Sequence, residues 1–266
     1  MPFKGPAGLL EKLRAKRPLI HHITNYVTVN DCANITLAVG ASPVMSHAED
    51  DVEEMVGLAQ ALVLNIGTCD RSQLRSMFLA GARANTLGIP IILDPVGAGA
   101  TRFRTNACQK LLQELKIAVL KGNGGEISVL AGAGGKVIGV DSAGTGDDPV
   151  SLVREYAKRL GITVAMTGAE DIVSDGKKTF LVANGHPLMG GFSGSGCMAG
   201  SVIGAFIAVS NDRVVATAAA LAAFGLAGER AAKGALSPFS LRQAIFDELY
   251  NLTPKDLAKG AKIKKA

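Results

Sequence analysis

The sequence contains no tryptophan, and aromatic residues make up only 5% of its 266 residues. Proteins that bind single-stranded nucleic acid usually combine basic grooves with aromatic platforms for the bases. The net charge of +5 does not supply such a surface, because residues 1–20 and 254–266 together carry +8 and leave the rest near −3. We therefore expect no nucleic-acid partner, and we expect residues 254–266 to form a basic, mobile tail.

Cysteine is also scarce. The sequence has four, far apart and without a C-x-x-C pair: Cys32, Cys69, Cys108 and Cys197. This spacing argues against a zinc site and against a disulfide framework. No signal peptide is recognisable, so we expect a cytoplasmic protein with reduced thiols. The uncharged segment 179–211 is interrupted by Asn184, Pro187 and several glycines. Its apolar part is too short to cross a bilayer, so we expect no membrane association.

Charged residues make up 19% of the chain and hydrophobic residues 48%, which is enough for a large core. This length suits one α/β domain over residues 1–266. Apolar runs of strand length alternate with helical patterns; the runs cover residues 41–45, 61–66, 89–93, 117–120 and 162–166. This alternation predicts a largely parallel sheet with crossover helices. Residues 172–182, with Asp175-Gly176 at their centre, predict a β-hairpin.

Several of the predicted strands end in glycine and polar residues. In an open α/β sheet, ligands bind outside the carboxyl ends of the strands. The residues expected around one crevice are therefore Thr68, Asp94, Asn123, Glu126, Thr167 and Asp171. Their shared position at strand ends is a stronger signal than any one of these clusters alone.

The stretch Gly190–Gly200 is a glycine-rich turn that runs into an apolar segment typical of a buried helix. Such a turn lets backbone N–H groups approach a ligand closely and favours negative charge. Gly194, Ser195 and Gly196 are the candidate anion hole, and Cys197 follows in the first helical turn, where a thiolate is favoured. No Gly-Lys-Ser/Thr follows, which excludes a Walker A loop. The alternative is a tight turn beside a core cysteine.

Two carboxylates near an anion hole suggest a hard cation that bridges an anionic substrate. Asp94 and Glu126 are the candidate ligands for Mg²⁺, which takes a few carboxylates together with phosphate oxygens. This is equipment for phosphoryl transfer, where positioning and charge neutralisation dominate and a weak base such as Cys197 suffices. Each residue also has a structural interpretation, since Asp94 precedes a proline in a turn and Glu126 could cap a helix.

At these motifs the chain resembles the hydroxyethylthiazole kinases, a family of the ribokinase-like superfamily. The similarity runs nearly end to end, and its most specific motif is Gly194-Ser195-Gly196-Cys197-Met198, because most of the superfamily has Asp where this family has Cys. The other motifs are Ile23-Thr24-Asn25-Tyr26-Val27, Pro43-Val44-Met45-Ser46-His47, Leu93-Asp94-Pro95-Val96-Gly97-Ala98-Gly99, Lys121-Gly122-Asn123 with Glu126, and Thr167-Gly168 with Asp171.

The resemblance implies a three-layer α/β/α fold and ATP-dependent, Mg²⁺-assisted phosphorylation of 4-methyl-5-(2-hydroxyethyl)thiazole in thiamine salvage. It implies that Asn25, Met45 and Gly194 contact the thiazole and that Cys197 is the base. It also implies a homotrimer with the thiazole site between subunits.

For the nucleotide and metal, the resemblance implies ATP contacts from Lys121 and Thr167 and magnesium ligands in Asp94 and Glu126. The family usually has Arg at position 121. Lysine keeps the charge but loses the bidentate fork, which puts nucleotide affinity in question. Residues 132–148 are unusually glycine-rich and are expected to form a flap or an exposed linker.

Three other functions remain open at this stage. A kinase of the same fold could act on hydroxymethylpyrimidine or pyridoxal, although Cys197 in place of Asp weighs against it. A cysteine hydrolase would need a base such as His22 or His186, and no triad motif supports it. A non-catalytic nucleotide-binding protein would not need the combination of Asp94, Glu126 and Cys197.

Overall fold

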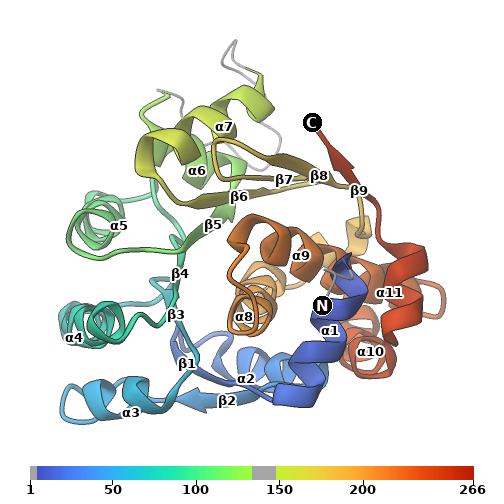
Figure 1. Cartoon of the computed structure of the whole chain (residues 1–266), viewed down its shortest axis with the longest axis horizontal. Helices are drawn as coiled ribbons and strands as arrows, with labels where there is room; N and C mark the ends of the chain where they lie inside the picture. Colours follow the sequence, from blue (N-terminus) through green and yellow to red (C-terminus); the bar gives the residue numbers. More distant parts are fainter. Residues whose placement is uncertain (1–4, 134–147) are drawn as a thin grey trace.

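The computed structural model describes residues 5–133 and 148–266. Most of the glycine-rich segment for which a flap or linker was expected lies outside these residues. In the described part, one mixed sheet has the strand order β2-β1-β3-β4-β5-β6-β7-β8-β9 (Figure 1). Its strands are β1 (Leu19–Ile23), β2 (Ser42–Met45), β3 (Ala61–Asn65), β4 (Ile91–Asp94), β5 (Val119–Asn123), β6 (Thr163–Thr167), β7 (Asp171–Ser174), β8 (Thr179–Val182) and β9 (Ile263–Lys265).

The sheet is parallel from β2 to β6 and antiparallel from β6 to β9. The parallel strands read as apolar runs because both of their faces are covered. The register places Asn65 of β3 beside Asp94 of β4, and Asn123 of β5 beside Thr167 of β6. The polar strand ends therefore lie along one edge of the parallel part of the sheet.

Helices cover both faces of the sheet, as Figure 1 shows. One layer holds α3 (Val52–Leu58), α4 (Arg71–Leu87), α5 (Arg102–Glu114), α6 (Gly124–Ala131) and α7 (Pro149–Leu160). The other holds α1 (Gly5–Lys16), α2 (Val29–Val39), α8 (Ser195–Ile207), α9 (Arg213–Ala232), α10 (Pro238–Asn251) and α11 (Pro254–Gly260), with a short 3₁₀ helix, η1 (Pro187–Gly191), before the glycine turn. The three-layer α/β/α fold with a largely parallel sheet and a hairpin, β7–β8, is confirmed.

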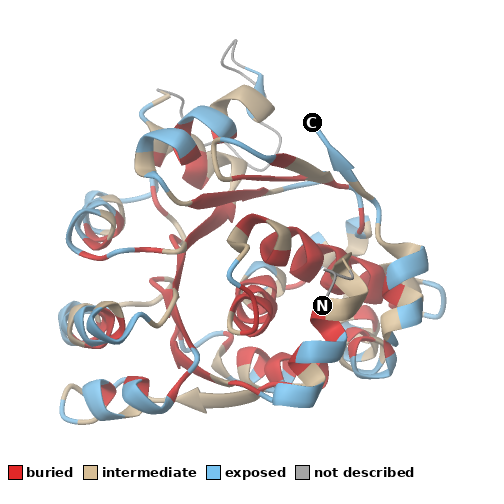
Figure 2. Cartoon of the chain, viewed as in Figure 1, coloured by how far each residue is buried: buried red, intermediate tan, exposed pale blue. Residues whose placement is uncertain are grey.

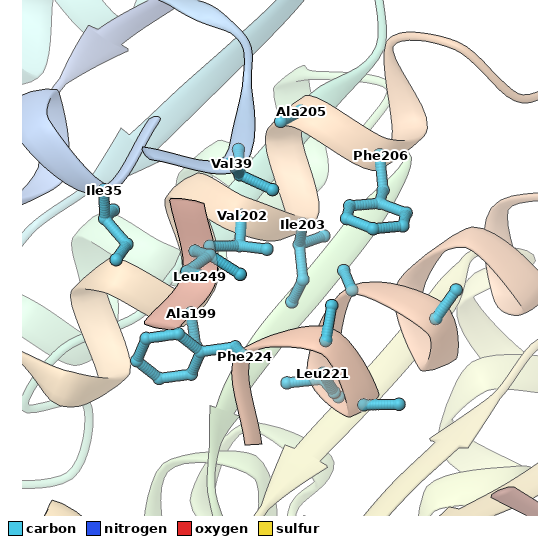
Figure 3. Close-up of a cluster of buried hydrophobic side chains, with 14 of the residues drawn as sticks. Ile35, Val39, Ala199, Val202, Ile203, Ala205, Phe206, Leu221, Phe224 and Leu249 are labelled. Atoms are coloured by element: carbon cyan, nitrogen blue, oxygen red, sulfur yellow. The ribbon is translucent and has the colours of Figure 1, made fainter. Parts of the chain in front are cut away.

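The core has two parts, one on each face of the sheet, and α8 is central to one of them (Figure 2). Side chains of α2, α8, α9 and α10 meet in this part (Figure 3). Gly204 lets α8 lie close to the sheet, because a Cβ at this position would come within 2.8 Å of Cγ2 of Val63 on β3. The close packing fixes α8, and with it the glycine turn at its start, over the centre of the sheet.

Helix α9 is long and apolar enough to cross a membrane by length and composition, but 83% of its apolar window is buried inside the protein. Alanines on α9 contribute much of this burial and pack against α8 and α10. Helix α9 is therefore a core helix of the protein.

The expected mobile tail is wrong. Residues 254–260 form α11, whose capping box pairs Thr253 with Asp256, and Leu257 is buried in the core. Residues 263–265 then form β9 as the edge strand beside β8. The lysine-rich composition suggested a solvated terminus, but lysines are also the residues that protect an exposed sheet edge from pairing with other chains.

Candidate active site

The site begins with the glycine turn that starts α8. Gly194 is the N-cap of α8 and has φ 104°, a conformation that residues with a side chain rarely adopt. A Cβ there would also lie 2.7 Å from Cγ2 of Thr28, so the turn packs tightly against the start of α2. The N–H of Met198 donates to the carbonyl of Gly194 at 2.9 Å. The N–H groups of Ser195, Gly196 and Cys197, in the first turn, have no acceptor within the helix and are available to an anion.

Cys197 lies in the first turn of α8, and its sulfur accepts two side-chain hydrogen bonds. Nδ2 of Asn25, from the loop after β1, and Nδ2 of Asn65, at the end of β3, each lie 3.3 Å from Sγ. The helix N-terminus adds a favourable field for a negative sulfur. The side chain is only partly buried, so a substrate can reach it.

No histidine side chain hydrogen-bonds Cys197 within residues 5–133 and 148–266. His22 is buried, its Nδ1 lies 3.1 Å from the carbonyl of Ile20, and burial lowers its pKa to about 4. His186 caps η1 through the N–H of Leu188. The geometry therefore gives no support to a hydrolase with a cysteine–histidine pair.

A buried ion pair lies directly behind the turn. Nζ of Lys121 on β5 is 3.3 Å from Oδ1 of Asp94 and 3.0 Å from the carbonyl oxygen of Gly196. Burial raises the pKa of Asp94 to about 6, although Lys121 partly offsets this effect. Burial alone would lower the pKa of Lys121, but the carboxylates of Asp94 and Glu126 raise it, so the lysine stays charged. The pair connects the end of β4 to the anion turn.

Glu126 lies in the first turn of α6 and belongs to a capping box with Asn123. Its Oε2 accepts from the N–H of Asn123 and its Oε1 from the N–H of Gly97, both at 2.8 Å. Glu126 therefore does cap α6, as its structural interpretation expected. It can still be a metal ligand, because each of its carboxylate oxygens has a second lone pair. The bond to Gly97 also holds the loop after Asp94 beside Glu126.

The donor set here fits a hard cation. Asp94 and Glu126 present buried carboxylates, and magnesium characteristically takes one or two protein carboxylates and completes its shell with water and phosphate oxygens. In the part of the chain that the structure describes, no cluster of three or more His, Cys, Asp or Glu side chains forms a closed metal cage. A site with few protein ligands suits a cation shared with a nucleotide rather than a structural metal.

Thr167 and Asp171 lie at the end of β6 and the start of β7. Oγ1 of Thr167 donates to the carbonyl of Gly122 at 3.3 Å, and Oδ1 of Asp171 accepts from the N–H of Gly168 at 3.0 Å. Burial raises the pKa of Asp171 to about 7. This region adjoins Glu126 through β5 and lies at the opposite side of the site from Asn25.

Met45 lies on the edge strand β2, and β1 separates it from β3 and Asn65. It ends β2, the edge strand, and pairs in register with His22 of β1. It makes no side-chain hydrogen bond, whereas Thr68 accepts one from the N–H of Tyr26 at 3.0 Å, which ties the end of β3 to the loop that carries Asn25. Met45 therefore lies on the Asn25 side of the site, away from Thr167.

Asn65 is a site residue that was not predicted from the sequence; it is 1% exposed and contacts Asp94, Asn25 and Cys197. Residues 61–66 were interpreted as an apolar strand, although Asn65 is a polar residue two positions before Gly67-Thr68. The strand-end argument that identified Asp94 and Asn123 applies equally to it. The signal was present in the sequence and was obscured by taking the strand one residue too far.

Comparison with known proteins gives consistent matches. The model of the "Hydroxyethylthiazole kinase family" matches residues 10–255. A hydroxyethylthiazole kinase from Methanocella arvoryzae is 59% identical over 264 residues, which cover 99% of each chain. The solved structure of a hydroxyethylthiazole kinase from Pyrococcus horikoshii OT3 is 46% identical, with a TM-score of 0.90 and 98% of each chain covered. A ribokinase-like superfamily protein from Enterococcus faecalis V583, 14% identical with a TM-score of 0.66 over 93% of this chain and 95% of its own, shares the fold.

Proposed function

The chain belongs to the hydroxyethylthiazole kinase family and phosphorylates the hydroxyl of 4-methyl-5-(2-hydroxyethyl)thiazole with ATP, as in thiamine salvage, and we propose that Cys197 is the base of this reaction. One observation carries the proposal. The Cys197 sulfur, the anion turn and the Asp94 carboxylate are joined by hydrogen bonds through Asn65 and Lys121. An acceptor for the proton and a cradle for the phosphate therefore lie within one connected network.

In the proposed reaction, Cys197 accepts the proton of the acceptor alcohol. The alcohol oxygen forms a bond to the γ-phosphorus, the bond from phosphorus to the β–γ bridging oxygen breaks, and ADP leaves. The hydroxyl proton passes to Sγ of Cys197. Because the transition state of phosphoryl transfer is loose, the proton need not leave first, and a thiolate is a sufficient base.

The anion hole and two polar residues serve the phosphates. Gly194, Ser195 and Gly196 lie at the start of α8, and their N–H groups are the proposed anion hole that would stabilise the charge on the transferring group. Lys121 neutralises charge beneath this turn, and Thr167 lies on the nucleotide side of the site. The ammonium of Lys121 is already bonded to Asp94 and to Gly196, so it acts as a fixed point charge without the fork of an arginine.

Asp94 and Glu126 would hold Mg²⁺. When bound, the ion supplies neutralisation of the phosphate charge and orientation of the phosphates. The protein's own contribution is to keep two carboxylates apart from solvent and close to the turn: Asp94 through Asn65 and Lys121, Glu126 through two backbone N–H groups. Glu126→Gln can keep the capping bond from the N–H of Asn123 and loses the bond from the N–H of Gly97, because the amide has one acceptor oxygen. It is expected to raise the magnesium concentration needed for half-maximal rate.

The thiazole is proposed to bind on the Asn25 side of the site, where Asn25, Met45 and Gly194 form its pocket. The side-chain amide of Asn25 is fully engaged in the protein, because its oxygen accepts from Thr28 and its nitrogen donates to Asn65 and Cys197. Asn25 therefore shapes the pocket wall and positions the sulfur. Met45 supplies apolar contact for the ring.

Assembly into a homotrimer with the thiazole site between subunits is part of the same proposal. Tyr26 and Val27, directly after Asn25, are 59% and 66% exposed, and Phe239 beside the glycine turn is also exposed. Large apolar side chains at the rim of a site are suited to cover by a neighbouring subunit. Sedimentation equilibrium should give three times the monomer mass, and Val27→Asp should lower that mass together with the activity. The cellular location is proposed to be the cytoplasm.

A panel of alcohols tests the substrate. The protein is incubated with ATP, Mg²⁺ and either the hydroxyethylthiazole, hydroxymethylpyrimidine or pyridoxal, and ADP release is measured. We expect turnover of the thiazole at a kcat/KM at least about 100-fold above the other two. Absence of thiazole turnover contradicts the assignment, and a preference for another alcohol identifies the alternative kinase.

A further inference from the structure

We infer that Asn65 is a positioning residue that holds the Cys197 sulfur as a hydrogen-bond acceptor and ties it to Asp94. The inference deepens the proposed role of Cys197 and rests on it. Nδ2 of Asn65 donates one N–H to Oδ2 of Asp94 at 2.9 Å and the other to Sγ of Cys197 at 3.3 Å. One amide group thus connects the residue proposed as base with the residue proposed as metal ligand.

The orientation of the Asn65 amide follows from its other partners. The backbone N–H of Gly67 can only donate, and it lies 2.9 Å from Oδ1 of Asn65. The atom that faces Gly67 must therefore be the oxygen, and the NH₂ group must face Asp94 and Cys197. Asn65 also ends β3 in register with Asp94, so the sheet itself fixes its position.

Asn25 is fixed in the same way. The N–H of Thr28 lies 3.0 Å from Oδ1 of Asn25, so the Asn25 NH₂ group faces Oδ1 of Asn65 and the Cys197 sulfur. The sulfur is thus approached by two amide groups that can only donate at these positions. Asn65 is the more constrained of the two, because a strand carries it and Asn25 lies in a loop.

Two donors aimed at one sulfur have a chemical consequence. A thiolate accepts both hydrogen bonds, whereas a thiol accepts them weakly and has to point its own hydrogen elsewhere. The network therefore holds the Cys197 sulfur as a hydrogen-bond acceptor toward Asn25 and Asn65. Removing the Asn65 donors should weaken this interaction without changing the anion turn, which is formed by the backbone of α8.

The test measures the sulfur itself, in the absence of ATP and thiazole. The wild-type protein, Asn65→Leu and Asn65→Asp are treated with iodoacetamide at one pH, and alkylation of the Cys197 peptide is followed by mass spectrometry. We expect Asn65→Leu to slow alkylation by about 10-fold and Asn65→Asp to slow it further, because Asn65→Asp removes the donors and adds a negative charge beside Asp94 and the sulfur.

The order of the two variants separates an electrostatic role from a structural one. Asp has nearly the shape of Asn and still accepts from Gly67 and Asn25, so a purely structural role predicts that Asn65→Asp is the milder change. Equal alkylation rates in all three proteins, or Asn65→Asp faster than Asn65→Leu, overturn the inference. If Asn65→Leu does not fold, Asn65→Asp alone decides, and a rate at or above that of the wild type overturns it.

Asn184→Asp is the matched control. Asn184 is likewise buried, and its Nδ2 donates to a carboxylate, Oε1 of Glu229, at 3.0 Å, with a second bond to the carbonyl of Gly260. The change therefore creates the same carboxylate–carboxylate contact away from Cys197. It should lower stability comparably and leave alkylation of Cys197 within about 2-fold of wild type.

Steady-state kinetics then connects the inference to the reaction. Asn65→Leu should lower kcat about 10–100-fold and leave KM for the thiazole within about 3-fold, since the proton acceptor is affected and the pocket is kept. If alkylation slows but kcat does not, the positioning role of Asn65 stands and Cys197 is not the base. If kcat falls with unchanged alkylation, the inference about Asn65 is wrong and the base role is untouched.

Discussion

At the carboxyl ends of the parallel strands β4 and β5 a lysine–carboxylate ion pair is buried, whereas beside β8 and β9 the lysines of two such pairs lie in solvent. The Lys121–Asp94 pair has side chains that are 4% and 1% exposed. The Lys178–Asp212 and Lys262–Glu229 pairs have lysines that are 49% and 55% exposed. Both regions contain lysine–carboxylate pairs at similar distances, so the surroundings make the difference between them.

The buried and exposed pairs differ in what they contribute to the free energy of unfolding. An exposed pair contributes at most about 1 kcal/mol, because water already solvates both partners and salt screens them. A buried pair costs several kcal/mol of desolvation per ion, which its partners must offset. The protein bears that cost for the Lys121–Asp94 pair at the edge of the sheet where the anion turn and Cys197 lie. The following variants test this contrast.

The largest effect is expected for Asp94→Asn. The change leaves the Lys121 ammonium buried without its counter-ion, and it removes a proposed metal ligand. The free energy of unfolding should fall by about 3–5 kcal/mol in urea denaturation. Turnover should fall below about one-thousandth of wild type.

Asp212→Asn is the matched change at the exposed end, because Asn still caps α9 through the N–H of Val215. It should cost less than about 1 kcal/mol. Equal losses in the two variants would remove the contrast between the buried and exposed regions.

The second effect depends on pH and concerns Asp171, which lies where the parallel and antiparallel parts of the sheet meet. Burial raises its pKa from the ordinary 3.8 to about 7. Between these values the folded state binds more protons than the unfolded state, so this group lowers stability as pH rises from about 4 to about 7. Asp171→Asn keeps an acceptor for the N–H of Gly168 and cannot ionise.

Urea denaturation of wild type and Asp171→Asn at pH 4 and pH 7 measures this effect. The stability of the variant relative to wild type should increase by about 2–4 kcal/mol over this range. If the two stabilities change with pH in the same way, the pKa of Asp171 is not raised by burial and the prediction is wrong.

The third effect concerns Cys197→Ala. Loss of the proposed base should lower kcat about 100-fold, equivalent to about 2.7 kcal/mol, and leave KM for the thiazole within about 3-fold. Cys69→Ala is the control: Cys69 precedes α4 and is also partly buried, and its replacement should leave kcat unchanged. Full activity of Cys197→Ala would mean that the turn and the carboxylates carry the reaction without this base.

Much of the fold could be predicted because the parallel strands are buried on both faces and the crossover helices are amphipathic or apolar. The glycine turn and Asp94 could be located because strand ends and helix starts have their own sequence signals. The antiparallel end was harder. Residues 263–265 form β9 only because β8 offers an unpaired edge, a long-range contact that the lysine-rich composition does not reveal.

The site shows the same limit. Most of its residues could be assigned to a strand end or to the glycine turn, and Asn65 was the exception. The bonds between them depend on register, which places Asn65 of β3 beside Asp94 of β4. The position of Lys121 between Asp94 and Gly196 also follows only from packing of α8 on the sheet. Sequence patterns therefore identified the groups, and tertiary structure determined which group modifies which.

The smallest effect is expected for Lys262→Met, at the exposed end. Nζ of Lys262 lies 3.0 Å from Oε2 of Glu229, but Glu229 keeps hydrogen bonds from Asn184 and from the N–H of Gly185 when the lysine is lost. The free energy of unfolding should change by less than about 1 kcal/mol, and activity should be unchanged. Lys121→Met is the matched change in the buried region. It leaves the buried Asp94 carboxylate without its counter-ion, so it should cost about 3–5 kcal/mol. A large loss for Lys262→Met would mean that the C-terminal strand is held mainly by this ion pair, and a small loss for Lys121→Met would mean that Asp94 takes up a proton when its partner is removed.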